Sequence, residues 1–343
     1  MIKISFIVPI YNDEQYIAQC IESLCAQKEQ ELEFLLIDDG STDDSLNICR
    51  KYEKQDSRIR VYHQTNQGAN VARNKGLMEA KGKWVCFIDG DDWIESNFCD
   101  TLDQYMSQDY DVIIYSFYKV FGNDKKRMES NAEKIEFKEA DFVDLQISSL
   151  NRLGPYKYNL KCLDPVSCWN KIYKRNFLIE NHIAFIPEIQ KLQDLTFNLQ
   201  VYDYAKNGIY LNTALYDYRY NPASVTNRYQ PDIVHKFDVI HEFLLPFVQN
   251  KPQEIFESVF WERIATHSRT CTVLYFCNRK NEKSYAERKK EFLDLMDKEP
   301  YATAIKRVNL CHFPVKEKIL SIVIRLKWFL GCEMLTLFQS ILR

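Results

Sequence analysis

The stretch Trp84–Asp92, WVCFIDGDD, joins a run of five apolar residues to three carboxylates. A short apolar run bounded by turn residues is typical of a buried strand. The stretch Phe34–Ser41, FLLIDDGS, repeats this arrangement with Asp38 and Asp39. Side chains that follow parallel strands gather at one edge of a sheet, so we expect the two acidic groups to be neighbours.

Strand and helix patterns alternate around these two stretches. Ile4–Val8 and Ile59–Tyr62 are further apolar runs of strand length, and apolar residues at helical spacing follow Tyr16, Ser45 and Asn70. This alternation predicts an α/β fold with a Rossmann-like, mostly parallel sheet flanked by helices. Ligands of such sheets bind at the carboxyl ends of the strands.

The remaining chain divides into two regions. Val112–Tyr115 predicts another strand, residues 121–135 a charged surface loop, and Asp194–Ala205 a helix. From about Asp232 the spacing of apolar residues predicts helices to the end. We therefore expect a sheet domain over residues 1–228 and a helical region over residues 229–343.

Composition narrows the class of protein. The 343 residues are 46% hydrophobic and 27% charged, an ordinary globular balance. A formal net charge of -3 provides no field that favours nucleic acid. The 11 cysteines include no C-x-x-C pair, which predicts reduced core thiols and a cytoplasmic protein. The apolar run near the N-terminus is short and interrupted, so it predicts a first strand rather than a signal peptide.

The acidic groups require a counter-charge. Close carboxylates repel one another, and a divalent cation would neutralise them while also holding a diphosphate. The alternative is that acids cap the following helices, which we favour for Asp43 and Asp44. The sequence contains neither a G-x-x-x-x-G-K-[ST] loop nor a G-x-G-x-x-G turn after the first strand. Phosphates would then be held by metal and side chains rather than by a glycine-rich loop.

A set of short motifs resembles the family-2 glycosyltransferases of the GT-A fold. They are Phe6–Asn12, Ile37–Asp43, Asn66–Gly68 with Ala72–Asn74, Phe87–Asp92, Trp169–Tyr173, Gln193–Phe197, Tyr218–Tyr220 and Ser224–Thr226. Each motif is weak alone, but their order and spacing match over about residues 1–228. The resemblance implies inverting sugar transfer from a nucleotide-sugar, usually a UDP-sugar. It also implies a nucleotide-binding half at 1–120 and an acceptor half at 121–228.

The resemblance assigns the pocket for the nucleotide base. Pro9 and Tyr11 would line it, with the Tyr11 ring offering a flat face on which uracil stacks. Asp39 would accept the uracil N3–H in a charge-assisted hydrogen bond. Arg73 would reach the base or the diphosphate, and Asn66 would help to close the pocket.

The acidic stretch after the fourth strand would serve the rest of the donor. In the family pattern Asp89 holds the ribose and, with Asp91, belongs to the site for Mn²⁺ or Mg²⁺. Asp91 would be the direct metal ligand. Asp92 would contact substrate, or it would simply cap the helix that follows.

The resemblance also implies that Asp194 is the catalytic base. Its position at the start of a helix stabilises the ionised carboxylate. The family commonly has a glutamate just before this aspartate, whereas here the residue is Gln193, which puts a second acidic role in doubt. Without the resemblance, Asp194 would be interpreted as an ordinary acid in the first turn of a helix.

Two further residues have open interpretations. Trp169 is a candidate wall for the donor sugar or the acceptor, and the alternative is a core tryptophan. Arg219 could contact phosphate, or it could be a solvated surface charge. The six histidines show no metal-ligand spacing and are interpreted as structural.

The segment Lys316–Arg343 places lysines and arginines among Ile, Leu, Val, Trp and Phe. Its longest apolar run, Ile319–Ile324, is too short to span a bilayer. One interpretation is a basic amphipathic helix at the inner face of the cell membrane. The other is a helix packed on the protein's own core or on a second subunit of a homo-oligomer.

These patterns predict an inverting glycosyltransferase of the hexosyltransferase type. It would move a sugar from a UDP-sugar to a hydroxyl of a glycan or a lipid-linked oligosaccharide, in capsule, exopolysaccharide or lipopolysaccharide synthesis. One alternative is a sugar nucleotidyltransferase, which would need a basic, glycine-rich loop after the first strand. Another is a non-catalytic glycan-binding or scaffold protein, which would be expected to have lost Asp91 or Asp194, and both are present.

Overall fold

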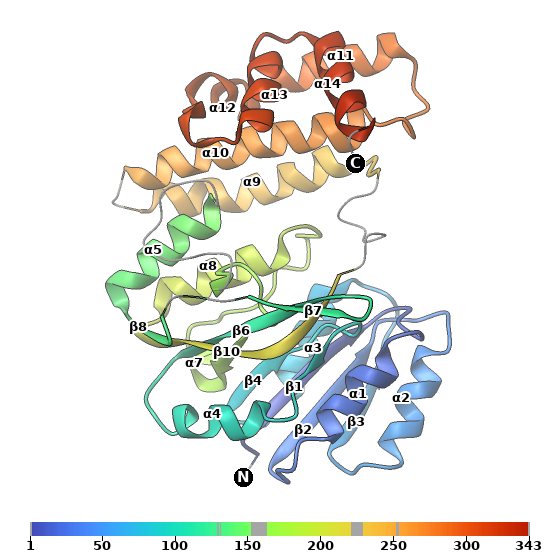
Figure 1. Cartoon of the computed structure of the whole chain (residues 1–343), viewed down its shortest axis with the longest axis vertical. Helices are drawn as coiled ribbons and strands as arrows, with labels where there is room; N and C mark the ends of the chain where they lie inside the picture. The colour runs from blue at the N-terminus through green and yellow to red at the C-terminus, as the bar shows by residue number, and fades with distance from the viewer. Residues whose placement is uncertain are drawn as a thin grey trace. The chain divides into compact units, whose positions relative to one another are not determined.

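The computed structural model describes residues 2–128, 130, 132–151, 163–220, 229–251 and 254–341. The chain forms two compact units (Figure 1). Met1–Ser149 and Tyr156–Asn221 build the first, and Leu150–Pro155 and Pro222–Arg343 build the second. The first unit contains a large sheet, whereas the second is helical.

The sheet of the first unit has the strand order β3-β2-β1-β4-β9-β6-β10-β5. Four strands at one end are parallel neighbours: β1 (Ile4–Ile10), β2 (Leu32–Asp38), β3 (Ile59–His63) and β4 (Trp84–Phe87). This confirms the predicted α/β class. It also brings the acidic turns after β2 and β4 to the same edge, on either side of β1.

The other end of the sheet is mixed. Strand β9 (Lys171–Lys174) lies antiparallel between β4 and β6 (Val112–Phe121). Strand β10 (Asn207–Arg219) then pairs parallel with β6, and β5 (Trp93–Ile94) pairs antiparallel with β10. The expected parallel arrangement therefore applies to β1–β4 and to the β6–β10 pair, but not to the strands inserted between and beyond them.

The charged segment 121–135 is not the surface loop that the sequence predicted. Strand β7 (Asp124–Arg127) turns back on β6 after Gly122, whose φ is 59°, and β8 (Lys134–Lys138) pairs antiparallel with β10. All four residues of β7 are exposed. A strand with no buried face has no apolar alternation, so the pattern could not reveal it.

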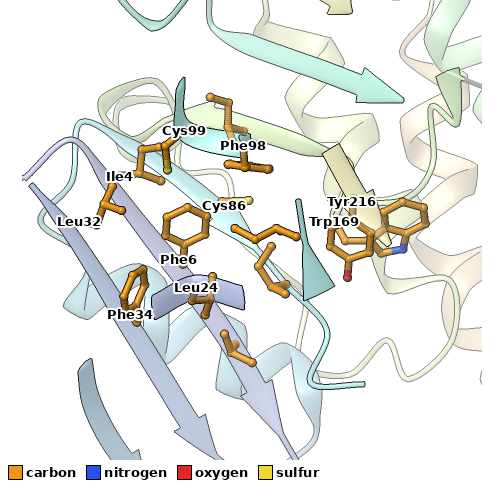
Figure 2. Packing of buried hydrophobic residues seen from close by; sticks show 14 of the residues in the cluster. Ile4, Phe6, Leu24, Leu32, Phe34, Cys86, Phe98, Cys99, Trp169 and Tyr216 are labelled. Atoms are coloured by element: carbon orange, nitrogen blue, oxygen red, sulfur yellow. The ribbon is translucent and has the colours of Figure 1, made fainter. Parts of the chain in front are cut away.

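Helices cover both faces of this sheet. Alternation along β1 separates the two cores, because Phe6 packs with residues of α1 and α4 whereas Ile7 packs with residues of α3 and α8. Figure 2 shows Phe6 beside Phe34 and Phe98. The centroid of the Phe6 ring lies 5.6 Å from the centroid of each of the other two rings. The helices of this unit are α1 (Ile17–Cys25), α2 (Ser45–Glu53), α3 (Ala69–Glu79), α4 (Phe98–Met106), α5 (Glu139–Leu150), α7 (Arg175–Glu180) and α8 (Gln193–Tyr204).

The second unit begins its helices at Ile233, which confirms the helical region predicted from about Asp232. In the part of the chain that the structure describes, no helix combines the length and the hydropathy needed to cross a bilayer. Ser224–Thr226 and the expected boundary at residue 228 lie outside the described residues. The elements are α9 (Ile233–Gln249), α10 (Ile255–Cys271), η2 (Thr272–Phe276), α11 (Tyr285–Asp297), α12 (Tyr301–Arg307), η3 (Leu310–His312), α13 (Val315–Arg325) and α14 (Phe329–Ile341).

Two buried histidines join α9 to α10. The Nε2 atom of His241 lies 2.8 Å from the Nδ1 atom of His267. The Phe237 ring stacks on His267 with centroids 3.9 Å apart, and Tyr301 meets His241 edge-on. Burial lowers the pKa of His241 to about 4, so the imidazole is neutral at physiological pH.

Candidate active site

The acidic turn after β4 is fixed by the last strand of the sheet. The Tyr216 hydroxyl donates to Asp92 Oδ2 at 2.7 Å and accepts the backbone N–H of Asp89 at 3.2 Å. The backbone N–H of Arg219 donates to Asp92 Oδ1 at 2.7 Å. Asp92 is buried and both of its oxygens accept from protein donors, so it anchors the turn. Helix α4 begins only at Phe98, so the alternative that Asp92 caps the following helix is wrong.

Asp13 joins Asp89 and Asp91 in one acidic cluster, and it was missed from the sequence. Burial, together with the charges of Asp91 and Asp89, raises the pKa of Asp13 to about 7. Burial and the charge of Asp89 raise the pKa of Asp91 to about 6. Gly90 allows the close approach, because a Cβ there would lie 2.7 Å from Asp13 Oδ2. The residues around Asp13, after β1, give no sequence signal that this side chain lies near Asp89 and Asp91.

This cluster fits a divalent cation only if the substrate supplies further ligands. Raised carboxylate pKa values reflect buried negative charge that a cation would stabilise. However, Arg73 Nη2 already donates to Asp89 Oδ1 at 2.8 Å. Within the described residues, no three histidine, cysteine, aspartate or glutamate side chains are grouped as a metal site. Asp91 is therefore the side chain best able to ligate a metal whose other ligands come from a diphosphate.

The residues predicted to line the base pocket lie where β1, β2 and the turn before α3 meet. Asp39 accepts the backbone N–H groups of Gln67 at 2.9 Å and Gly68 at 2.7 Å, so this carboxylate is held rigidly. Pro9 is buried in β1, whereas the Tyr11 ring that follows is 49% exposed and can offer a face to a ligand. Asn66 is also exposed, on the loop beside Gly40.

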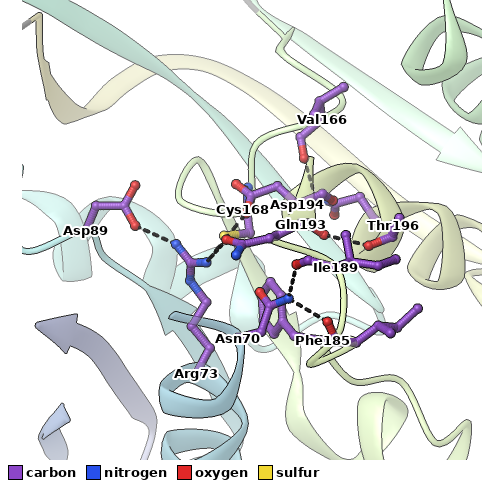
Figure 3. A network of polar contacts seen from close by, with 12 residues as sticks. Asn70, Arg73, Asp89, Val166, Cys168, Phe185, Ile189, Gln193, Asp194 and Thr196 are labelled. Carbon is purple, nitrogen blue, oxygen red and sulfur yellow. Dashed lines mark hydrogen bonds and ion pairs between the residues drawn. The ribbon is translucent and has the colours of Figure 1, made fainter. Parts of the chain in front are cut away.

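Arg73 links the donor side of the site to the predicted base (Figure 3). Its Nη2 donates to Asp89, while its Nη1 lies 3.8 Å from Asp194 Oδ1 and 3.3 Å from Gln193 Oε1. The other oxygen of Asp194 accepts the backbone N–H of Cys168 at 2.9 Å. The carboxylate therefore has a defined orientation in the first turn of α8. Burial raises the pKa of Asp89, and the Arg73 guanidinium opposes that effect.

Two asparagines of α3 hold the segment that leads into α8. Asn70 Nδ2 donates to the carbonyls of Ile186 at 2.6 Å and Ile189 at 2.7 Å. Asn74 exchanges two hydrogen bonds with the backbone of Phe185, at 2.7 and 2.9 Å. Asn74 lies in a motif identified from the sequence, but its partner could not be inferred there. The asparagines fix the position of Asp194 relative to α3.

Trp169 and Arg219 are engaged inside the protein. Trp169 is 6% exposed and stacks on Tyr216 and Tyr218, with ring centroids 4.7 and 5.4 Å away. The structure thus favours the core interpretation of this tryptophan. Arg219 Nε donates to the backbone carbonyl of Asp91 at 2.7 Å, and its guanidinium lies over the Trp93 ring. Arg219 is therefore a half-buried positive charge that hydrogen bonds hold beside the acidic turn.

The fold and motifs find direct counterparts among known proteins. Residues 5–160 match the model of the family described as "Glycosyl transferase family 2". EpsH of Bacillus subtilis (strain 168), described as a glycosyltransferase, is 31% identical over 276 residues, which cover 78% of this chain and 76% of EpsH.

The chain belongs to glycosyl transferase family 2. This confirms the predicted class of enzyme, a glycosyltransferase.

Solved structures agree with this glycosyltransferase fold. The crystal structure of S. aureus TarS 1–349 in complex with UDP-GlcNAc aligns with a TM-score of 0.68, 22% identity, and coverage of 97% of this chain and 90% of that chain. The mannosyltransferase PcManGT from Pyrobaculum calidifontis, in complex with GDP-Man and Mn²⁺, aligns with a TM-score of 0.51, 12% identity, and coverage of 98% and 87%. These likenesses confirm the GT-A fold of the chain.

Proposed function

We propose that this glycosyltransferase moves a sugar from a UDP-sugar to an acceptor hydroxyl with inversion at the anomeric carbon, and that Asp194 is its base. The observation that carries the proposal is the Arg73 bridge between Asp89 and Asp194. With the donor beside Asp89, this arrangement would leave Asp194 to act on the acceptor, as an in-line displacement requires.

The donor would bind along the carboxyl ends of β1, β2 and β4. Asp39 would accept the uracil N3–H with Oδ2, which accepts only from Gly68, whereas Oδ1 accepts from both Gln64 and Gln67. The exposed Tyr11 ring would stack on the base, and Asn66 would close the pocket over it. The complex of TarS with UDP-GlcNAc supports a uridine donor for a protein of this fold.

Asp91 would hold Mn²⁺ or Mg²⁺, with Asp89 beside it. A bound divalent cation would neutralise the diphosphate as it leaves. Arg219 lies next to Asp91 and adds a fixed positive charge on the same side. The Mn²⁺ named in the PcManGT complex supports a divalent metal for a protein of this fold.

Asp194 would take the proton from the attacking hydroxyl. Such a hydroxyl does not ionise at neutral pH, so a carboxylate within hydrogen-bond reach must remove its proton as the new bond forms. The backbone N–H of Cys168 orients one oxygen of Asp194 and Arg73 lies near the other. Asp91 is unsuitable as the base because it would be occupied on the leaving-group side.

The acceptor would be a hydroxyl of a glycan or a lipid-linked oligosaccharide in surface-polysaccharide synthesis, and the enzyme would work in the cytoplasm. The cysteines in the described residues are free thiols, which agrees with a reducing compartment.

Replacing Asp194 by Asn tests the base. The amide keeps the shape but lacks basicity, so transfer should fall by about a hundredfold to ten-thousandfold. UDP affinity, measured by calorimetry, should stay nearly unchanged. Asp203→Asn, an exposed change on the same helix, is the matched control. Near-normal turnover of Asp194→Asn, or a product whose anomeric configuration by NMR equals that of the donor, would reject the mechanism.

A further inference from the structure

Helix α13 has two apolar faces. Leu320, Val323 and Ile324 are buried in the core of the second unit. Four other apolar residues are separated by four, three and four positions, which places them in one line along a helix. We call these residues the outer stripe: Val315, Ile319, Ile322 and Leu326, which are 41% to 73% exposed.

A tryptophan extends the outer stripe past the end of the helix. Trp328 follows Lys327, whose φ is 53°, and it is 53% exposed. The Trp328 ring packs against Gly331, where any side chain would clash with it, because a Cβ there would lie 2.5 Å from the ring. Leu330 and Met334 of α14 are exposed next along the chain, at 49% and 58%. Soluble proteins normally expose apolar residues singly. Here several exposed apolar residues follow one another along one helix and the start of the next.

Positive charges flank the outer stripe on both sides. Successive residues are rotated by about 100° around a helix. Lys316 therefore falls on one side of the stripe and Lys318 on the other, and these two lysines form the cationic rim. Arg325 lies on the side of Lys318, but its guanidinium donates to the backbone carbonyls of Ile305 at 2.6 Å and Val308 at 2.9 Å. The one acidic residue in the sequence of α13, Glu317, lies on the side of the helix opposite the stripe; its side chain is 44% exposed, and Arg269 donates to it at 2.9 Å. The outward side of α13 thus has an apolar centre with a cationic rim.

We propose that the outer stripe, Trp328 and the cationic rim bind the surface of an anionic lipid bilayer. An apolar stripe enters the boundary between headgroups and acyl chains while flanking lysines reach the anionic headgroups. Tryptophan is favoured at that depth because its ring is amphipathic. A second copy of the chain fits less well, because a symmetric contact between two such faces would set the cationic rims against each other. This surface contact goes beyond the proposed sugar transfer and does not depend on it.

Vesicle binding of the full chain tests the proposal. The protein should float with vesicles of phosphatidylglycerol and phosphatidylcholine, bind pure phosphatidylcholine vesicles far less, and be released at high salt. Trp328 fluorescence should shift to the blue on binding, and Trp328→Phe should abolish that shift. Ile319→Ser with Ile322→Ser should weaken binding by roughly tenfold or more, because both lose buried apolar area. Lys316→Glu with Lys318→Glu should have an effect of similar size.

Two control variants separate this surface from general effects. Ile179→Ser alters an apolar side chain that is 46% exposed in the first unit, against 45% for Ile319. Lys289→Glu with Lys290→Glu alters two exposed lysines on α11. Both controls should bind vesicles like the unaltered protein, and all variants should melt normally. Absence of vesicle binding, equal binding by the stripe variants, or a dimer in light scattering that the stripe variants abolish would overturn the proposal.

Discussion

At the scale of single residues, the site is built from carboxylates whose surroundings give them different roles. Asp92 is buried and bound by Tyr216 and Arg219, so it supports the acidic turn. Asp39 is held by two backbone N–H groups and keeps a fixed orientation. Within the described residues, Asp91 shows no such anchor to another strand, which agrees with its proposed role as the ligand of a divalent cation.

Replacing Asp39 by Asn should weaken UDP binding. The amide would turn one N–H donor toward the N–H groups of Gln67 or Gly68, and it would lose the charge that favours the uracil N3–H. Hydrogen bonds to charged groups contribute about 1.5–3 kcal/mol, so affinity should fall by roughly tenfold to a hundredfold. Calorimetry measures this loss, and Asp44→Asn in the same turn is the control. Equal UDP affinity in the two variants would remove Asp39 from the base pocket.

The sequence identified the residues of the site better than it identified their contacts. The motifs placed Asp39, Arg73, Asp89, Asp91 and Asp194 in one region, and the structure brings Arg73 between Asp89 and Asp194. It could not show that Asp13 joins the acidic cluster or that Asn70 holds the approach to α8, because those partners are far apart in sequence. Periodicity reports which face of an element is buried but not what covers that face.

At the scale of elements, the strands that the sequence revealed are those whose residues are buried. β1, β2 and β4 are buried over their whole lengths and appear as mostly apolar runs. β7 is entirely exposed and shows no apolar pattern. β8 alternates Ile135 and Phe137 with charged residues, so the sequence did contain a strand signal there, and the predicted loop overlooked it. In the second unit, apolar spacing predicted helices correctly, but it gave no sign of the paired histidines between α9 and α10.

Those histidines should make the second unit sensitive to acid. The pKa of His241 is lowered from 6.5 to about 4 in the folded protein, so the unfolded chain binds the proton more readily. The contribution of the neutral His241 imidazole to the free energy of unfolding is therefore present above pH 6.5 and is lost as the pH falls toward 4. The full loss is on the order of 3 kcal/mol, at about 1.4 kcal/mol per pKa unit.

Thermal unfolding followed by circular dichroism between pH 7.5 and 4 measures this effect. His241→Gln should lower stability at pH 7 but flatten its dependence on pH below 6.5. His235→Gln changes an exposed histidine of the same helix and should leave the pH dependence as it is. If the His241→Gln and unaltered proteins lose stability in parallel on acidification, the buried pair is not the sensor.

At the scale of the whole molecule, the chain combines a sheet unit that contains the site and a helical unit that exposes the outer stripe. Proteins of two units often unfold in more than one step. A ligand stabilises only the folded state that binds it, by an amount that grows with its concentration relative to the dissociation constant. Donor and metal should therefore act on the unfolding of the sheet unit.

UDP with Mn²⁺ should raise the melting temperature of the sheet unit and leave a separate helical transition unchanged. At a hundred times the dissociation constant the stabilisation is about 2.7 kcal/mol. EDTA should remove the Mn²⁺-dependent part of the shift, and Asp91→Asn should lose that part while keeping the effect of UDP alone. Calorimetry resolves the transitions. A metal-dependent shift of full size in Asp91→Asn would exclude Asp91 as the ligand.

The position of β10 has a consequence for how the enzyme is made. This strand is the last of its unit to leave the ribosome, yet it lies inside the sheet between β6 and β5. Until it emerges, the side of β6 that it pairs with has no partner, and such an open edge can recruit other chains. The acidic turn also waits for Tyr216 and Arg219, so donor binding cannot precede the synthesis of residue 219. Premature termination before Asn207 would thus yield an inactive chain in which β6 keeps an unpaired, aggregation-prone edge. We therefore expect chaperones to be needed most before β10 has been synthesised.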